Sequence, residues 1–196
     1  MLSHKKSLNI LKKTNALLEG HFILSSGLHS SKYIQCAKLL SFPDLAEKIC
    51  KSLANQIKKK YKKIDLILSP AIGGIIIGYE IGRLLKKETI FCERVKGKFT
   101  LRRGFNINKG ARVLIIEDVI TTGKSSLECV KLIKKSNAKL VGFACLIDRT
   151  SKAKLTNKII SQVRLKIPIY NKKNLPTYIK EIPVTKPGSR FLKWLN

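Results

Sequence analysis

Hydrophobic residues in the first third of the chain follow helical spacing in some segments and short strand-like runs in others. Between residues 5 and 18, apolar positions recur at roughly helical spacing, which predicts an amphipathic helix that ends before Gly20. Residues 21–36 carry two apolar runs around a polar turn that contains Gly27, which predicts two short strands or a loop and a strand. Pro43 then opens a segment with apolar residues at spacing four, typical of a helix.

From residue 64 onward, apolar strands and helices alternate. Strands are expected at 64–69, 89–94, 112–118 and 139–147, and helices at 75–85 and 124–136. Such alternation indicates parallel strands covered on both faces, so the fold class is α/β with a mostly parallel central sheet flanked by helices. The segment 151–196 holds four of the six prolines and is expected to add an edge strand and an irregular end rather than a second domain.

The composition favours a single globular domain inside the cell. The chain has 196 residues, of which 44% are apolar, enough for a real core. Its longest uncharged apolar stretch, residues 66–79, is interrupted by Pro70 and three glycines and is shorter than the ~20 apolar residues of a membrane-spanning helix. The N-terminus lacks the continuous apolar region of a secretory signal. Five cysteines without a C-x-x-C pair are expected to be reduced core residues. We therefore expect a cytoplasmic protein without a membrane span.

The net charge of +28 comes from 40 basic residues against 12 acidic ones. Clustered cations of this kind are compatible with nucleic-acid binding, because they release counterions from phosphates. Only eight of the basic residues are arginine, however, and the lysines are scattered in doublets and triplets such as 58–60 and 134–135. Base-reading proteins favour arginine, whose planar fork makes bidentate contacts. Solvated lysine-rich faces are therefore favoured over a specific nucleic-acid surface.

Candidate functional residues follow the strand with the clearest apolar pattern in the chain, residues 112–118. That strand ends in two adjacent carboxylates and leads into the next helix through a loop rich in hydroxyls, which together read Glu117, Asp118, Val119, Ile120, Thr121, Thr122, Gly123, Lys124 and Ser125. Ligands of open α/β sheets bind beyond the carboxyl ends of the strands. A helix N-terminus offers unpaired N–H groups there, and glycine lets the backbone approach an anion. The loop is therefore a candidate phosphate cradle.

A helix cap and a Walker A motif are two simpler interpretations of this loop. A helix cap would account for the hydroxyls and the glycine. The adjacent carboxylates favour instead a ligand with a phosphate at one end and sugar hydroxyls or hydrated Mg²⁺ at the other. A Walker A loop is excluded, because Asp118 stands five residues before Gly123, where that motif requires glycine.

The strand, the acidic pair and the loop resemble the phosphoribosyl pyrophosphate signature of the type I phosphoribosyltransferases, and they read VLIIEDVITTGKSS over 113–126. Five further stretches are similar to the orotate branch of this family and occur in the expected order: GHFILSSGLHSSKYIQC (20–36), SPAIGGIIIGYEIGR (69–83), FCERVKGKFTLRRGF (91–105), LIDRTS (146–151) and PVTKPGSR (183–190). Together they span most of the chain.

The resemblance implies the type I phosphoribosyltransferase fold, with a mobile hood loop at 96–110 and a small N-terminal hood segment that binds the base. It implies transfer of the 5-phosphoribosyl group from phosphoribosyl pyrophosphate to orotate, giving orotidine 5-phosphate and pyrophosphate in pyrimidine biosynthesis. Mg²⁺ held mainly by the substrate is the implied cofactor, and a homodimer with shared active sites is the implied assembly. The single domain would divide into a hood segment (1–40), an α/β core (41–150) and a C-terminal edge segment (151–196).

Residue roles are implied by the same resemblance. The expected catalytic residues are Lys98, in the hood loop, and Asp118. The residues expected to bind phosphoribosyl pyrophosphate are Gly73, Arg94, Glu117, Asp118, Val119, Ile120, Thr121, Thr122, Gly123, Lys124 and Ser125. The residues expected to bind orotate are Tyr33, Thr121 and Arg149.

Several assignments have alternatives. Arg149 could form a local ion pair with Asp148, and Tyr33 could be an ordinary core residue. Lys96 or Arg103 would align with the family's hood cation almost as well as Lys98 does. Some members carry a lysine in the pyrophosphate turn and a histidine in the hood, and this chain has neither.

The rival functions are a purine-type phosphoribosyltransferase and a non-enzymatic regulator that senses the sugar donor. His4, His21 and His29 are scattered without an evident partner and are given no catalytic role.

Overall fold

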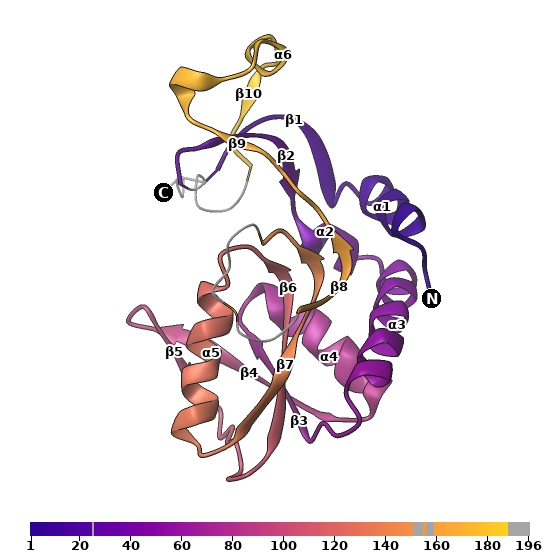
Figure 1. Ribbon diagram of the computed structural model, residues 1–196, viewed down its shortest axis with the longest axis vertical. Helices are drawn as coiled ribbons and strands as arrows, with labels where there is room; N and C mark the ends of the chain where they lie inside the picture. Colours follow the sequence, from indigo (N-terminus) through magenta and orange to yellow (C-terminus); the bar gives the residue numbers. More distant parts are fainter. Residues whose placement is uncertain (25, 151–154, 156–158, 188–196) are drawn as a thin grey trace, which may run out of the picture.

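The computed structural model describes residues 1–24, 26–150, 155 and 159–187. Figure 1 shows an α/β core and a smaller sheet beside it. In chain order the elements are α1 (His4–Lys13), β1 (Leu17–Ile23), β2 (His29–Ile34), α2 (Cys36–Leu40), α3 (Pro43–Lys60), β3 (Leu66–Pro70), α4 (Gly73–Leu85), β4 (Glu88–Val95), β5 (Lys98–Leu101), β6 (Arg112–Ile120), α5 (Lys124–Lys135), β7 (Lys139–Asp148), β8 (Ile159–Arg164), β9 (Ile169–Tyr170), η1 (Lys172–Asn174), α6 (Thr177–Lys180) and β10 (Val184–Thr185).

The central sheet has the strand order β5-β4-β3-β6-β7-β8. All neighbouring pairs from β4 to β8 are parallel, whereas β4 and β5 pair antiparallel. Helices cover both faces of this sheet (Figure 1). The arrangement confirms the predicted α/β class with a mostly parallel sheet.

Strand β6 is buried on both faces. Its residues Leu114 and Ile116 pack into a core shared with α1, α2, α3 and α4, whereas Val113 and Ile115 pack into a second core shared with α5. All four side chains are inaccessible to solvent. Burying a side chain of this size contributes roughly 1.5–3 kcal/mol relative to leaving it exposed. The carboxyl end of β6 is therefore held firmly between two layers of helices.

The first helix ends at Lys13, so the prediction that it extends to residue 18 was wrong. Asn15 adopts a left-handed φ of 53°, and the residue after it donates its N–H to the carbonyl of Leu11 at 2.9 Å. The N–H of Asn15 itself bonds the carbonyl of Lys12 at 3.0 Å. These two bonds form a Schellman motif, in which asparagine takes the place of the more common glycine. The apolar residues that follow belong to β1.

A second sheet has the order β10-β1-β2-β9. Its centre is the β1–β2 hairpin, which confirms the two short strands predicted around Gly27. The outer strands come from the C-terminal segment: β9 pairs antiparallel with β2, and β10 pairs parallel with β1. Sequence analysis missed both strands, because two residues are too few to establish an alternating pattern. The C-terminal segment also supplies β8, at the edge of the central sheet.

The segment expected to be a polar hood loop, 96–110, begins instead as part of a β-hairpin. Lys96 and Gly97 form its turn with φ values of 48° and 79°, and β5 follows directly. Positive φ at both central residues is typical of the tight turns whose twist matches paired strands. Residues 98–101 thus form an edge strand with an exposed face, whereas the remainder of the segment, 102–110, consists of turns and irregular structure.

All five cysteines are free and buried, which confirms the expectation of reduced core residues. Burial raises the pKa of the Cys36 and Cys145 thiols well above the ordinary value. Among the residues that the structure describes, no helix is both long and apolar enough to cross a membrane.

His21 and His29 do have partners, contrary to the expectation from the sequence. Nε2 of His21 lies 2.6 Å from Nδ1 of His29, and Nδ1 of His21 lies 3.2 Å from the carbonyl oxygen of Ile182. Both rings are buried in the second sheet. Burial lowers the pKa of His29, and the nearby His21 and Lys172 lower it further. The close ring nitrogens can share one proton but not two.

We predict that this pair makes the fold sensitive to acid. A histidine whose pKa is lowered by folding stabilises the protein fully above the unfolded value of ~6.5, and this contribution is lost as pH falls below it. The free energy of unfolding of His29→Gln should therefore fall less than that of the wild type between pH 7 and pH 5, as measured by urea denaturation. His4→Gln, at an exposed position, is the control. An equal fall in the wild type and His29→Gln would contradict the prediction.

Candidate active site

The candidate site lies at the carboxyl edge of the central sheet. Register pairing places Ile120 of β6 opposite Asp148 of β7, and Asp148 opposite Arg164 of β8. The loop after β6 and the residues after β7 therefore emerge side by side. On the other flank of β6, β3 ends at Pro70 and leads into α4.

The loop after β6 is shaped by Gly123, which precedes α5 as its N-cap. Gly123 has a left-handed φ of 74°, and a Cβ there would lie 3.0 Å from Cγ of Leu155, so glycine suits the position on both counts. Gly123 makes no side-chain cap bond to α5, and Thr121 and Thr122 are exposed. The hydroxyl of Thr122 accepts the N–H of Lys124 at 3.4 Å, so a long local cap bond of the kind in the helix-cap alternative is present. A hydroxyl that accepts this bond keeps its own O–H, which stays available to an anion.

The two carboxylates that end β6 lie in different surroundings. Glu117 is 7% exposed, and its Oε1 accepts a hydrogen bond from the hydroxyl of Ser126 in α5. Burial raises the pKa of Glu117 to about 7, and the neighbouring Asp118 adds to the rise. Asp118 is half-buried, and its Oδ1 accepts the N–H of Val119 at 2.9 Å. Burial raises the pKa of Asp118 as well. Asp118 is thus the more accessible acid, whereas Glu117 ties β6 to α5.

The turn between β3 and α4 approaches Asp118 closely. A Cβ on Gly73 would lie 2.7 Å from Oδ2 of Asp118, so no other residue fits at Gly73 without displacing the carboxylate. The Ala71–Ile72 peptide bond in this turn is cis. The structure thus brings Gly73 together with the loop after β6, as the sequence analysis expected of a pyrophosphate turn.

Arg149 follows β7 and lines a cavity of about 780 Å³. Its Nε is buried and has no hydrogen-bond partner among the described residues, and burial lowers its pKa. The alternative of an ion pair with Asp148 is not observed, because Asp148 pairs with Arg164 at 3.0 Å. The cavity is lined by Thr121, Thr122, Arg149, Thr150, Arg164, Lys166, Ile167, Pro168 and Ile169. A guanidinium that lines a cavity, with a buried Nε left unpartnered among the described residues, is suited to a carboxylate or phosphate.

Tyr33 lies on β2, where its hydroxyl donates to Oε1 of Gln35 at 3.0 Å and its ring contacts that of Phe22. Burial raises the pKa of the Tyr33 hydroxyl. Three residues further on, the thiol of Cys36 lies 3.9 Å from the backbone oxygen of Asp118. The N-terminal segment thus meets the carboxyl end of β6, although Tyr33 does not line the cavity beside Arg149.

The cations expected in a hood lie on or beside the β4–β5 hairpin at one edge of the sheet. Arg94 pairs with Glu128 of α5 at 2.8 Å and lies over the ring of Phe99, and Arg103 pairs with Glu93 at 2.9 Å. Lys98 is exposed on the edge strand β5, which β4 and β3 separate from β6. Within one chain, the structure therefore does not bring Lys98 to the loop after β6. The roles expected of Arg94 and Lys98 stay predictions.

The sequence did not indicate that Arg164 lines the same cavity as Arg149. No local motif marks this position, because its relevance comes from the register of β8 against β7. The resemblance also covered Ser151 and residues 188–190, which lie outside the described part of the chain.

Comparison with known proteins identifies the class to which this fold and site belong. A family model described as a phosphoribosyl transferase domain matches residues 43–181. The chain therefore belongs to the phosphoribosyltransferase family. It is 48% identical over 193 residues to the orotate phosphoribosyltransferase of Parvibaculum lavamentivorans, an alignment that covers 97% of this chain and 100% of the relative.

Solved structures show the same fold. The orotate phosphoribosyltransferase of Aeropyrum pernix matches with a TM-score of 0.67 and 24% identity, over 81% of this chain and 93% of that one. An adenine phosphoribosyltransferase from Thermoanaerobacter pseudethanolicus matches with a TM-score of 0.60 and 18% identity, over 68% of this chain and 88% of that one. Since enzymes for different bases share the fold, the base must be argued from the site.

We predict that Glu117 makes the protein less stable at alkaline pH. An acid whose pKa is raised by folding stabilises the native state at low pH, and this contribution is lost as pH rises from ~4.5 through about 7. Glu117→Gln keeps an acceptor for Ser126 and removes the titration. Relative to wild type, its free energy of unfolding should rise by up to about 3 kcal/mol between pH 5 and pH 8, measured by urea denaturation. Glu88→Gln, at an exposed position, is the control. A constant difference at both pH values would refute this role.

Proposed function

We propose that this protein transfers the 5-phosphoribosyl group from phosphoribosyl pyrophosphate to orotate, which yields orotidine 5-phosphate and pyrophosphate. The observation that carries this choice of base is Arg149, whose buried Nε lacks a partner among the described residues and whose side chain shares a cavity with the loop threonines. Orotate bears a carboxylate that such a guanidinium can hold, whereas adenine and hypoxanthine bear none. The identity of 48% to the Parvibaculum lavamentivorans orotate phosphoribosyltransferase supports the same choice.

In this reaction, N1 of orotate loses its proton and bonds to the anomeric carbon, while the bond from that carbon to the pyrophosphate oxygen breaks and pyrophosphate leaves. Positive charge develops on the sugar, so the protein contributes by orienting two ligands and stabilising charge. The N–H groups at the start of α5, with Thr121 and Thr122, would bind the 5-phosphate. Asp118 would accept hydrogen bonds from the ribose hydroxyls, and the Gly73 turn would lie against the pyrophosphate.

The donor set at this edge suits Mg²⁺, which prefers oxygen ligands and keeps several waters. The half-buried Asp118 is the carboxylate available to it, since Glu117 is engaged by Ser126. No cluster of three or more histidine, cysteine or acidic side chains occurs within the described ranges, so the phosphates would supply most of the ligands. When bound, Mg²⁺ would neutralise charge on the departing pyrophosphate.

The direct test is the loss of orotate absorbance when purified protein is mixed with orotate, phosphoribosyl pyrophosphate and Mg²⁺. We expect turnover that requires the sugar donor and stops when a chelator removes the metal. Adenine and hypoxanthine serve as competing acceptors in parallel reactions. Turnover of a purine without turnover of orotate would overturn the proposal in favour of the purine-type rival.

Arg149→Ala should raise the KM for orotate about tenfold or more and leave the KM for phosphoribosyl pyrophosphate nearly unchanged. The reason is the loss of a charge-assisted hydrogen bond, worth about 1.5–3 kcal/mol, to the base alone. Steady-state kinetics with each substrate varied in turn gives both values. Equal increases in the two KM values would contradict the role of Arg149 in base binding.

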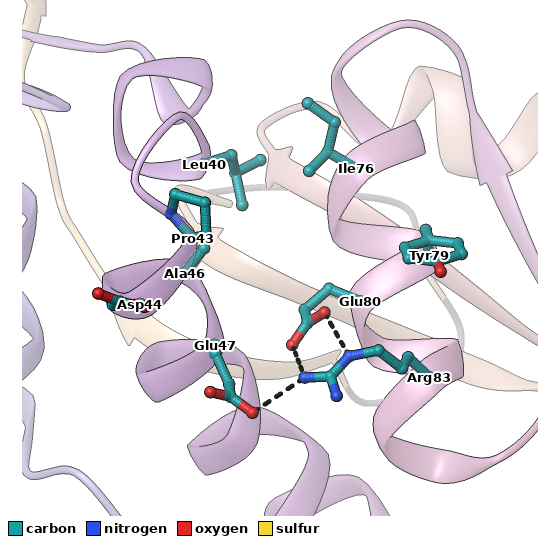
Figure 2. Close-up of a pocket in the computed structure, with 9 residues that line it drawn as sticks. All are labelled: Leu40, Pro43, Asp44, Ala46, Glu47, Ile76, Tyr79, Glu80 and Arg83. Atoms are coloured by element: carbon teal, nitrogen blue, oxygen red, sulfur yellow. Dashed lines mark hydrogen bonds and ion pairs between the residues drawn. The ribbon is translucent and has the colours of Figure 1, made fainter.

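We further propose that the working unit is a homodimer that meets through α4. Ile72, Ile76 and Tyr79 recur at helical spacing on one exposed stripe, with exposed fractions of 86%, 52% and 65%. An apolar stripe of this kind on a helix usually packs against a partner. The stripe borders a groove of about 460 Å³ (Figure 2).

The groove beside this stripe is acidic in an otherwise basic chain. Asp44, Glu47 and Glu80 line it, three of only 12 acidic residues, and Figure 2 shows Arg83 bridging the last two. A lysine-rich segment of a second copy of this chain would be complementary to such a groove. The exposed cations of the β4–β5 hairpin would then reach the neighbouring subunit's site.

Mixing two variants that are impaired at different residues, assayed at low orotate, tests this shared site. Lys98→Ala should lower kcat strongly with the fold intact, and Arg149→Ala should be poorly active at low orotate. If Lys98 serves the neighbouring site, hybrid dimers carry one intact site, and mixing should restore activity to about one quarter of wild type. Ile76→Asp, which should disrupt dimers, is the control for subunit exchange. Near-normal turnover of Lys98→Ala, or no recovery from hybrids verified by size and mass, would refute the shared site.

We also propose that residues 1–40 act as the hood segment and 41–150 as the catalytic core. Residues 151–196 would act as an edge segment, which contributes β9 and β10 to the second sheet. The five buried free thiols favour a reducing compartment, and we propose a cytoplasmic location.

A further inference from the structure

We propose that Arg164 is a second cation for the carboxylate of the base and determines the preference for a carboxylated pyrimidine, with the buried Asp148 as its positioning residue. This inference rests on the proposed transfer to orotate. Arg164 comes from β8, in the C-terminal segment, and was not singled out by any motif.

The sheet register places Arg164 at the site. Ile120, Asp148 and Arg164 form one row across β6, β7 and β8. The ladder continues past this row, since the N–H of Leu165 donates to the carbonyl of Asp148 at 2.9 Å. Arg149 and Arg164 then line the same cavity, with Lys166 two residues further along.

The Asp148 carboxylate orients the Arg164 side chain through an ion pair. This carboxylate is 2% exposed, and its Oδ2 lies 3.0 Å from Nε of Arg164. Its Oδ1 accepts hydrogen bonds from the N–H and the hydroxyl of Thr150 at 2.8 and 2.7 Å. Both oxygens are therefore committed, and a buried carboxylate with satisfied oxygens keeps a fixed orientation. The Arg164 side chain remains 69% exposed, so the ion pair leaves much of it available to a ligand in the cavity.

The charge balance of the cavity favours an anion. Arg149, Arg164 and Lys166 contribute three positive charges to its lining, and Asp148 compensates for one. A ligand carboxylate would compensate for the repulsion between the Arg149 and Arg164 guanidinium groups. A base without a carboxylate would not compensate for this repulsion.

The carboxylate of the base is the better match than the 5-phosphate. The phosphate is proposed to bind at the start of α5, which follows β6. Arg164 lies two strands away, on β8. A cation there is suited to the end of the site farther from the α5 N-terminus.

The test compares Arg164→Gln with Arg112→Gln. The second substitution breaks a similar ion pair, between Arg112 and Asp65, at the end of the sheet where β6 begins and away from the site. We expect Arg164→Gln to raise the KM for orotate about tenfold, as for loss of one charge-assisted hydrogen bond, with the KM for phosphoribosyl pyrophosphate unchanged. The inhibition constant of the neutral carboxamide analogue of orotate should not change. Arg164→Lys should recover part of the orotate affinity, and Arg112→Gln should alter neither KM.

Three results would overturn the inference: an unchanged orotate KM in Arg164→Gln, equal weakening of orotate and its carboxamide, or weakening confined to phosphoribosyl pyrophosphate. Thermal unfolding of each variant separates loss of fold from loss of recognition, and Arg164→Lys provides the same comparison if Arg164→Gln does not fold. Wild-type protein that fails to convert orotate would refute the proposed function itself, whereas active wild type with an unaffected Arg164→Gln would refute only the role of Arg164.

Discussion

The site depends on the parallel hydrogen-bond ladder that joins β6 to β3 on one side and to β7 on the other. Parallel strands end at a common edge, so this ladder places the loop after Ile120 between the Gly73 turn and Arg149. Burial of β6 on both faces keeps the register, because a shift by one residue would exchange the side chains of the two cores. The rigid strand thus positions a loop that has few interactions of its own.

The acidic residues at the carboxyl edge of the central sheet have hydrogen-bond or ion-pair partners, whereas Arg149 has an unpartnered Nε among the described residues. The buried acids have dedicated partners: Glu117 is bonded by Ser126, and Asp148 is held by Thr150 and Arg164. Arg149, by contrast, is left with an unpartnered Nε among the described residues. Burying a polar group without a partner costs free energy, and such a group is retained where a ligand completes it. The unpartnered Nε of Arg149 is therefore the feature on which the proposed anion site rests.

The second sheet links the two ends of the chain across the site. The β1–β2 hairpin carries Tyr33 and leads to Cys36, which meets the backbone of Asp118, while β9 and β10 close the sheet from the C-terminal side. The connection from β8 to β9 contributes Lys166 to the cavity wall. The residues proposed for base binding and the loop proposed for phosphate binding therefore come from separate parts of the sequence. The hairpin with Lys98 stands apart at the far edge of the central sheet, which is why the proposed active unit contains two chains.

The sequence by itself determined the α/β class, the β6 strand and the loop from Glu117 to Ser125, because each depends on local periodicity and turn chemistry. It also pointed to Arg149 through its place after an apolar strand and its resemblance to a family motif. The early end of α1 was missed, since asparagine at the left-handed position of a Schellman motif is a weaker signal than glycine. Only the tertiary structure decided that His21 meets His29, that Asp148 pairs with Arg164 rather than with Arg149, and that β10 joins β1. These contacts join residues that are distant along the chain or lie on neighbouring strands, and strand register, which no local pattern encodes, sets which side chains meet.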